Sequence, residues 1–153
     1  MAKILTHMYM FAGLEESDLA KIENIAELES YSPGDRIFTQ GEPADAMFMI
    51  QHGAVKIVIM EDDDEEVELA KLGTGSHFGE MSMLDGEPRS GTAISEAYSD
   101  IIRISHAPMN ELLESDQDLA VHIYREISRF LCSRLRLTSL DLSYIRSQNP
   151  GLF

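Results

Sequence analysis

The chain has 153 residues, of which 44% are hydrophobic, and it carries a formal net charge of −15. This length suits one domain with a sizeable core, and no stretch reaches the ~18 continuous apolar residues that a transmembrane helix needs. The acidic balance disfavours direct binding to nucleic acid, which normally requires a basic face. The single cysteine, Cys132, excludes an intramolecular disulfide. Together with the lack of a signal-peptide pattern at the N-terminus, it predicts a cytoplasmic location.

The N-terminal part of the chain has helical features. Residues 1–13 are apolar and rich in methionine, and we expect them to form a short helix or an arm packed on the domain. Ser17 is a residue type that caps helices, and the apolar residues after it recur at helical spacing. We therefore predict a helix over residues 16–27.

From Leu28 onward the hydrophobic period changes to two, which is typical of β-strands. Short runs rich in β-branched and aromatic residues are separated by turns at Gly34, Gly41, Gly53 and Gly75, where we expect positive φ angles. The predicted strands are 28–31, 36–39, 46–51, 54–60, 67–72, 91–96 and 100–105. This pattern predicts an α+β fold, in which an antiparallel β-roll of the jelly-roll (double-stranded β-helix) kind has helices at its ends.

An unbroken acidic run, EDDDEE, occupies residues 61–66 between two predicted strands. It lacks the central glycine and the distal glutamate spacing of an EF-hand calcium loop. We therefore interpret the run as the solvated tip of a hairpin.

Two helices are expected after the roll, over residues 107–115 and about 117–146, with Ser115 or Asp116 capping the second. The long helix has two apolar stripes. The stripe expected to pack on the roll consists of Leu119, Ile123, Ile127, Phe130 and Leu137. The other, with the alternating spacing of a coiled-coil seam, consists of Val121, Tyr124, Ser128, Leu131, Leu135, Thr138, Leu142 and Ile145. The seam predicts a parallel homodimer about this helix, and the alternative is one wide buried face.

The stretch from His77 to Ser95, HFGEMSMLDGEPRSGTAIS, contains the groups that a phosphorylated sugar needs. Gly79 has no Cβ, so its backbone can approach a ligand closely. Residues 80–84 can form one helical turn whose free N–H groups face an anion. Arg89 provides a planar fork of donors for a phosphate, and Glu80 a carboxylate for a sugar hydroxyl. The alternative is a surface ion pair between these two residues.

No catalytic constellation is visible in the sequence. The five histidines, His7, His52, His77, His106 and His122, have no metal-type spacing with each other or with Cys132. Because Cys132 lies in the middle of the long predicted helix, we expect it to be a buried structural thiol. We therefore predict neither a catalytic nor a metal site, and a protein that is not an enzyme.

The segments FGE, MSML, DGE and PRSGTA, at residues 78–93, resemble the phosphate-binding cassette of the cyclic nucleotide-binding domain family. Residues 77–95 are called the cassette below. LGTGSHFGE (72–80) is similar to the approach to that cassette, and SPGDRIFTQGEPADAMFMIQHGAVKI (32–57) to the family's paired strands. The resemblance covers about residues 14–145, with Gly91 where alanine is usual. It implies one domain over residues 1–153, with a helix and β-roll at about 14–106 and C-terminal helices at about 107–146.

The resemblance also implies a binding site. Glu80 would hold a ribose 2′-hydroxyl, Arg89 would neutralise a cyclic phosphate, and Gly79 and Ser90 would complete the phosphate contacts. RLRLTSLDLSYI (134–145) resembles the long helix of bacterial catabolite activator proteins, in which a Thr-Ser pair reaches the adenine, the second residue from the opposite subunit. We expect cAMP as the ligand, and Ser90 leaves cGMP open. The implied ligand-binding residues are Phe78, Gly79, Glu80, Met81, Arg89, Ser90 and Gly91, with Thr138 and Ser139 matching the pair.

The sequence ends at Phe153, soon after the long predicted helix, so we expect no DNA-binding domain of the activator kind. The chain would then be a stand-alone sensor that acts through a protein partner, or an excised regulatory domain. Ligand contacts at the cassette are expected to reposition the long helix. One alternative is a degenerate module that serves only for dimerisation or docking. Another is a sensor of haem or an iron–sulfur cluster, which a single cysteine and scattered histidines disfavour.

Overall fold

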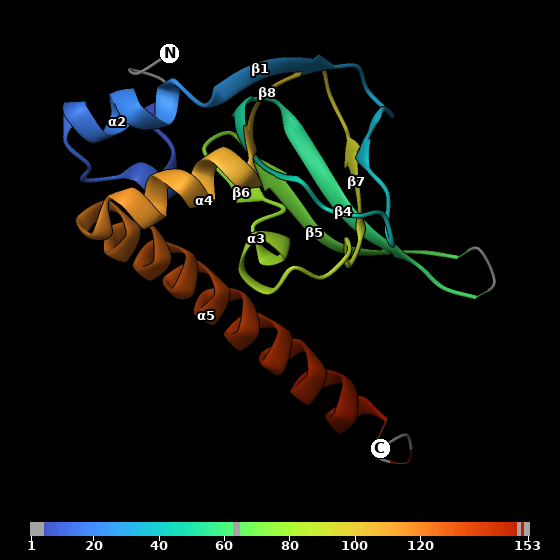
Figure 1. The fold of residues 1–153 in the computed structure, drawn as a ribbon. Helices are drawn as coiled ribbons and strands as arrows, with labels where there is room; N and C mark the ends of the chain where they lie inside the picture. Colours follow the sequence, from blue (N-terminus) through green and yellow to red (C-terminus); the bar gives the residue numbers. More distant parts are fainter. Residues whose placement is uncertain (1–4, 63–64, 150, 152–153) are drawn as a thin grey trace.

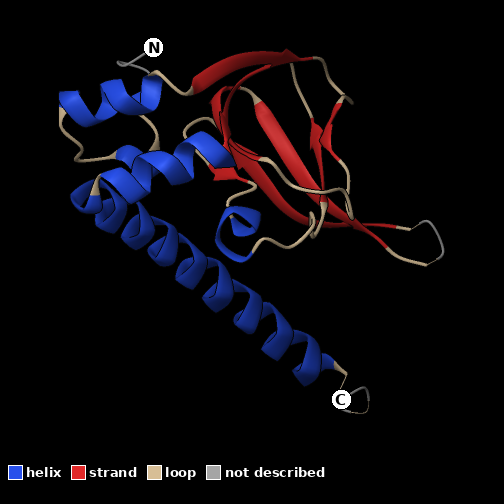
Figure 2. Cartoon of the chain, in the orientation of Figure 1, coloured by secondary structure: helices blue, strands red, loops and turns tan. Residues whose placement is uncertain are grey.

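The computed structural model describes residues 5–62, 65–149 and 151. Two sheets form a roll, short helices cover one end of it, and a long helix extends away from it (Figures 1 and 2). None of the helices in the described ranges is long and apolar enough to cross a membrane. The elements in chain order are η1 (Tyr9–Phe11), α2 (Glu16–Glu23), β1 (Ala26–Tyr31), β2 (Arg36–Phe38), β3 (Ala46–His52), β4 (Ala54–Met60), β5 (Glu66–Gly73), β6 (His77–Phe78), α3 (Met81–Asp85), β7 (Thr92–Ser95), β8 (Ser99–Ser105), α4 (His106–Ser115) and α5 (Gln117–Gln148).

Each sheet has four strands, in the orders β1-β8-β3-β6 and β2-β7-β4-β5, and all pairings among the described strands are antiparallel. The predicted α+β fold with an antiparallel β-roll is therefore confirmed. All seven predicted strands lie within two residues of observed ones. The turn glycines Gly34, Gly41, Gly53 and Gly75 have positive φ, as expected. The two-residue strand β6 was missed because it is too short to have a hydrophobic period.

The N-terminal helix begins at Glu16, as predicted, but its end and its capping residue differ from the prediction. It ends at Glu23, because Ala26–Tyr31 form β1 and pair in register with β8. The sheet thus takes the backbone hydrogen bonds that a longer helix would have used. The prediction that Ser17 caps the helix is wrong, because the helix already begins at Glu16 and Glu15 has the extended cap conformation.

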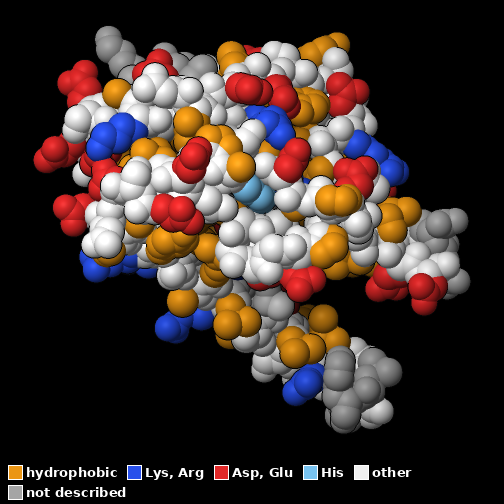
Figure 3. Space-filling view, viewed as in Figure 1, with side chains coloured by type: hydrophobic (Ala, Val, Ile, Leu, Met, Phe, Trp, Pro, Cys, Tyr) orange, Lys and Arg blue, Asp and Glu red, His pale blue; other side chains and the backbone are white. Residues whose placement is uncertain are grey.

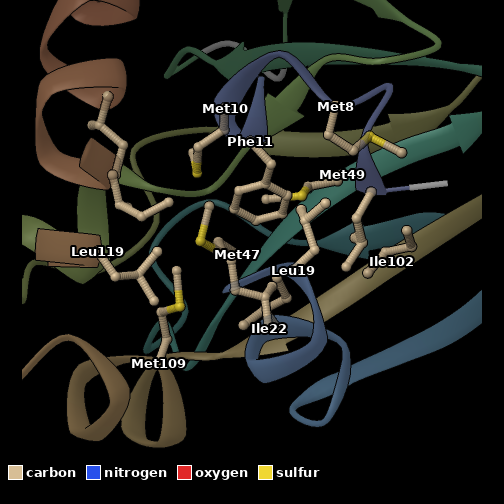
Figure 4. Packing of buried hydrophobic residues seen from close by; sticks show 14 of the residues in the cluster. Met8, Met10, Phe11, Leu19, Ile22, Met47, Met49, Ile102, Met109 and Leu119 are labelled. Atoms are coloured by element: carbon tan, nitrogen blue, oxygen red, sulfur yellow. The ribbon is translucent and has the colours of Figure 1, made fainter. Parts of the chain in front are cut away.

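Strand β3 separates two hydrophobic clusters, because successive side chains of a strand point to opposite faces. Phe48 and Ile50 belong to the cluster between the two sheets. Met47 and Met49 belong to the other cluster, where the sheet meets the N-terminal segment, α4 and α5 (Figure 4). The described part of the N-terminal arm packs in this second cluster, as expected. Its buried residues there are Leu5, Met8, Met10 and Phe11.

The first half of α5 is fixed to the roll and its second half is not. The helix begins after Asp116, whose Oδ1 accepts a hydrogen bond of 3.1 Å from the N–H of Leu119, so the Asp116 cap is confirmed. Leu119, Ile123 and Ile127 are buried. Phe130, Leu131 and Arg134 are half-buried beside the roll, and beyond them the helix projects away from it (Figure 1).

Two predictions for side chains of α5 are wrong. Leu137 was expected to pack on the roll, but its exposed fraction is 60%. Cys132 was expected to be buried, but it is an exposed free thiol. Cys132 lies between Leu131 and Arg134, which reach the roll, but on a face of the helix that is turned away from it. Leu137 continues the apolar periodicity, but it lies beyond the end of the roll, on the projecting part of α5. Figure 3 shows hydrophobic side chains along this part of α5.

β4 and β5 form the hairpin predicted around the acidic run, paired from Ala54↔Gly73 to Met60↔Glu66 with one shift of register between Ile57 and Val58. The Glu61 N–H donates to the Glu65 carbonyl at 3.0 Å near the tip. Residues 63–64 of the run lie outside the described residues. Within the described ranges, no group of three or more His, Cys, Asp or Glu side chains could hold a metal ion.

Candidate ligand-binding site

The cassette begins as a strand and turns sharply into a short helix. β6 pairs with β3 through Phe48↔Phe78 and Met49↔His77. Gly79 then adopts a φ of +79°, which only glycine takes without strain, and the chain enters α3. The expected helical turn over 80–84 is therefore present, displaced by one residue.

Arg89 is held inside the cassette by its neighbours, and its exposed fraction is only 5%. Its Nη2 donates to the Ala46 carbonyl at 2.7 Å and its Nη1 to the Gly79 carbonyl at 3.2 Å. Its guanidinium carbon lies 4.1 Å from the centroid of the Phe38 ring. Burial lowers the pKa of Arg89, but a guanidinium stays charged near neutral pH. Because a guanidinium has five N–H groups, Arg89 can hold these two carbonyls and also donate to an anion.

Gly79 is required where Arg89 approaches the backbone. A Cβ at this position would lie 2.8 Å from Arg89 Nη1 and 3.4 Å from the Ala46 carbonyl oxygen. Arg89 also ties the cassette to the loop before β3, since its N–H donates to the Glu42 carbonyl at 2.9 Å and its carbonyl accepts from the Gly41 N–H at 2.9 Å. The guanidinium position therefore depends on both segments.

Glu80 is a buried carboxylate, with an exposed fraction of 4%. Its Oε2 lies 3.3 Å from Nδ1 of His77, and the geometry is not that of a hydrogen bond. Neither atom has a hydrogen-bond partner among the described residues. A buried polar atom without a partner is costly. Because a carboxylate accepts hydrogen bonds on both of its oxygens, Glu80 can accept one from a ligand hydroxyl in addition to one on Oε2.

His106 lies close to Arg89 and to the backbone of Gly79 in the cassette. Burial, and then the charge of Arg89, lower the pKa of His106, while a hydrogen bond to the Gly79 backbone opposes this effect. The ring is therefore neutral near pH 7, because its ordinary value is near 6.5. The backbone N–H of His106 donates to the Asp45 carbonyl at 2.7 Å, which fixes the start of α4 against the start of β3.

Gly79, Glu80 and Arg89 line one cavity between the cassette, the sheet β2-β7-β4-β5 and α5. It contains about 740 Å³ of empty space, part of which is open to solvent. Seven of the nine predicted site residues line it: Phe78, Gly79, Glu80, Met81, Arg89, Ser90 and Gly91. The lining residues that the sequence did not indicate are Phe38, Ile57, Leu69, Leu72, His77, Ser82, Phe130, Leu131 and Arg134.

The two remaining predicted site residues, Thr138 and Ser139, do not line the cavity. Both are exposed on the projecting half of α5, and Thr138 Oγ1 donates to the Arg134 carbonyl at 2.9 Å. The residues of α5 that reach the cavity are Phe130, Leu131 and Arg134. Phe130 could have been found from the sequence, because it was assigned to the stripe that faces the roll.

A β-roll whose cavity is lined by a buried guanidinium, a buried carboxylate and a C-terminal helix has groups that suit a small anionic ligand with a hydroxyl group. The chain belongs to the cyclic nucleotide-binding domain family, whose profile matches residues 28–116.

Similarity to three other proteins is consistent with this family membership. The cAMP-dependent protein kinase type II regulatory subunit of Drosophila melanogaster is 34% identical over 90 residues, covering 59% of this chain and 24% of that protein. The CRP-like cAMP-activated global transcriptional regulator of Mycobacterium tuberculosis is 27% identical over 152 residues, covering 99% of this chain and 66% of that protein. The Thermus thermophilus catabolite activator protein superposes with a TM-score of 0.77 at 26% identity, covering 90% of this chain and 62% of that chain. The chain therefore spans less than two thirds of each of these relatives.

Proposed function

We propose that the chain binds a cyclic nucleotide, cAMP in the first place, and that binding regulates a partner through α5. The observation that carries this proposal is the convergence of Arg89 and Glu80, both buried, on one cavity. A cyclic nucleotide has one negative phosphate and a ribose 2′-hydroxyl, and these two residues match them in charge and in hydrogen bonding. The chain's part in this proposal is regulatory binding, with no catalytic step.

The apolar part of the cavity supports a purine as the third portion of the ligand. Leu69 and Leu72 of β5 line it on one side, and Phe130 and Leu131 of α5 on the other. The guanidinium of Arg134 lies 6.0 Å from the centroid of the Phe130 ring, close enough for a favourable contact with an aromatic face. We expect a flat aromatic base to lie between these surfaces.

The choice of cAMP over cGMP rests on the relatives named above, two of which have cAMP in their names. Ser90 lines the cavity beside Arg89, and its hydroxyl could serve either purine nucleotide. Both nucleotides are therefore needed in the binding experiment.

The proposed allosteric path runs from the cavity to α5, because Phe130, Leu131 and Arg134 belong to both. A ligand that contacts these residues would favour one position of the helix over another. The exposed apolar seam, which includes Val121, Leu135, Leu142 and Ile145, would then form a parallel homodimer or receive a protein partner. In such a dimer Thr138 and Ser139 would be placed to approach the base of a nucleotide bound across the interface.

Hydrogen exchange of residues 128–148 with and without cAMP tests this path. Ligand-dependent protection of the helix is expected, and identical exchange in both states would contradict it.

Light scattering across a range of protein concentrations tests the homodimer. A cytoplasmic location stays a prediction from the sequence.

Isothermal titration calorimetry with cAMP and with cGMP tests the binding. Glu80→Gln removes the charged acceptor, and hydrogen bonds to charged groups contribute roughly 1.5–3 kcal/mol, so affinity should fall roughly 10- to 150-fold. The matched control is Glu87→Gln, which changes an exposed carboxylate of the same cassette and should leave affinity unchanged.

Arg89→Ala should weaken binding more than Glu80→Gln does, by about 2–5 kcal/mol relative to the wild type. It also removes the two bonds to Ala46 and Gly79, so a thermal melt must accompany it. If the wild-type chain binds neither nucleotide, the binding proposal fails, and the exposed seam of α5 then favours a module for dimerisation or docking.

A further inference from the structure

His77 is a buried side chain next to Glu80 that the family resemblance does not assign. It is the first residue of β6, and its exposed fraction is 3%. Its main chain is fixed by pairing opposite Met49 and by the bond from the Ile50 N–H to the Ser76 carbonyl, at 2.9 Å. The position of the ring therefore depends on the rotation of its side chain and on what packs against it.

One edge of the ring faces the carboxylate. Nδ1 of His77 lies 3.3 Å from Oε2 of Glu80, and both atoms are buried without a hydrogen-bond partner in the described part of the chain. When Nδ1 carries the ring hydrogen, a small rotation of either side chain turns this contact into a hydrogen bond to the carboxylate. Such a bond would fix one oxygen of Glu80 and aim the other at a ligand hydroxyl.

The other side of the ring faces α5. The centroids of the His77 and Phe130 rings are 4.2 Å apart, with an angle of 51° between the ring planes. His77 and Phe130 also line a second cavity, whose charged residues Glu126 and Arg129 come from α5. His77 thus lies between Glu80 of the cassette and the helix that also forms the wall of the main cavity.

We propose that His77 is a positioning residue for ribose recognition, which holds the Glu80 carboxylate toward the 2′-hydroxyl while its own ring is held by Phe130. The inference rests on the proposed function, because it needs a nucleotide in the cavity. It adds a residue whose effect is specific to one hydroxyl of the ligand.

The experiment compares the affinities of the whole chain for cAMP and for 2′-deoxy-cAMP by titration calorimetry. The ratio of the two dissociation constants measures what the 2′-hydroxyl contributes, and we expect at least a tenfold preference for cAMP in the wild type. His77→Phe keeps an aromatic ring against Phe130 but removes Nδ1. We expect it to reduce the preference below threefold while changing the affinity for 2′-deoxy-cAMP less than threefold.

Three further variants give this comparison its controls. His77→Asn places an amide near the position of Nδ1 and should retain most of the preference. His52→Phe makes the same change at an exposed histidine of β3 and should behave as wild type. In a Glu80→Gln background, His77→Phe should reduce the preference no further, because both residues act through the same carboxylate.

Several results would overturn the inference. Equal weakening of both nucleotides by His77→Phe would make His77 a packing residue only, and an unchanged preference would show that Glu80 does not need it. A wild type that binds cAMP without preferring it to 2′-deoxy-cAMP would remove the ribose role of Glu80. A wild type that binds neither nucleotide would instead refute the proposed function itself.

A measurement on the wild type covers the case in which His77→Phe does not fold. The ¹⁵N resonance of His77 Nδ1 should shift more with cAMP than with 2′-deoxy-cAMP. Equal shifts with both ligands would overturn the inference.

Discussion

Replacing Gly79 by alanine tests whether the cassette depends on the close approach of Arg89 to the backbone. Gly79 has a φ of +79°, and a Cβ there would lie 2.8 Å from Arg89 Nη1. Gly86, at the end of α3, has a φ of +71°, and a Cβ there would meet nothing within 4 Å. Gly86→Ala is therefore a matched control, with the same backbone strain and no contact with the guanidinium.

The expected magnitudes follow from these two contacts. A side chain in the left-handed region costs roughly 1–2 kcal/mol of the free energy of unfolding, and this applies to both variants. Gly79→Ala must also move Arg89 away from the Gly79 and Ala46 carbonyls. Hydrogen bonds with a charged donor contribute roughly 1.5–3 kcal/mol, so Gly79→Ala should lose about 2 kcal/mol more than the control.

Thermal and urea denaturation of both variants measure this difference. For a domain of this size about 2 kcal/mol corresponds to a further decrease of roughly 4–8 °C in the melting temperature. Gly79→Ala should also weaken cAMP binding, while Gly86→Ala should not. If the two variants are equally stable, or if Gly79→Ala binds cAMP as tightly as the wild type does, the hypothesis that the cassette depends on the close approach of Arg89 is wrong.

Three further predictions concern the core, the pH dependence and the thiol. Leu119→Ala should reduce the free energy of unfolding by about 2–5 kcal/mol in urea, because Leu119 is buried, whereas Leu140→Ala, at a 67% exposed position, should change it by less than about 0.5 kcal/mol. The lowered pKa of His106 means that the unfolded chain takes up a proton that the folded chain excludes, so stability should fall as pH decreases below about 6.5. His106→Leu should flatten this dependence between pH 7.5 and 5, and an unchanged slope would contradict it. Cys132 should react with DTNB in the native protein as fast as in the unfolded chain, and slow reaction would show that it is covered.

Much of the roll could be predicted from the sequence because its signals are local. The period of two and the turn glycines placed seven strands within two residues. Strand β6 has two residues, too few for a period, and its existence depends on the pairing of Phe78 with Phe48. The early end of α2 likewise depends on β8, a strand far away in the sequence. Both features depend on hydrogen bonds between residues far apart in the sequence, which cannot be predicted from neighbouring residues alone.

The residues of the candidate site likewise fall into those that are close together in the sequence and those that only the fold brings together. The seven predicted cassette residues are close together in the sequence, and all of them line the cavity. Phe38, which lies against the Arg89 guanidinium, comes from β2, and the wall formed by Leu69 and Leu72 comes from β5. Their apolar character indicated strands, but only the folded sheet brings them to the cassette.

The sequence by itself determined the kinds of elements, their order and the chemical groups of the cassette, because short-range periodicity, turn residues and one contiguous segment encode them. The tertiary structure decided how far the roll extends along α5. It leaves Leu137 exposed, and within one chain it brings Phe130 and Arg134 to the cavity. The reason is physical: helical periodicity specifies which face of a helix is apolar, but where a neighbouring surface ends depends on the packing of the whole chain.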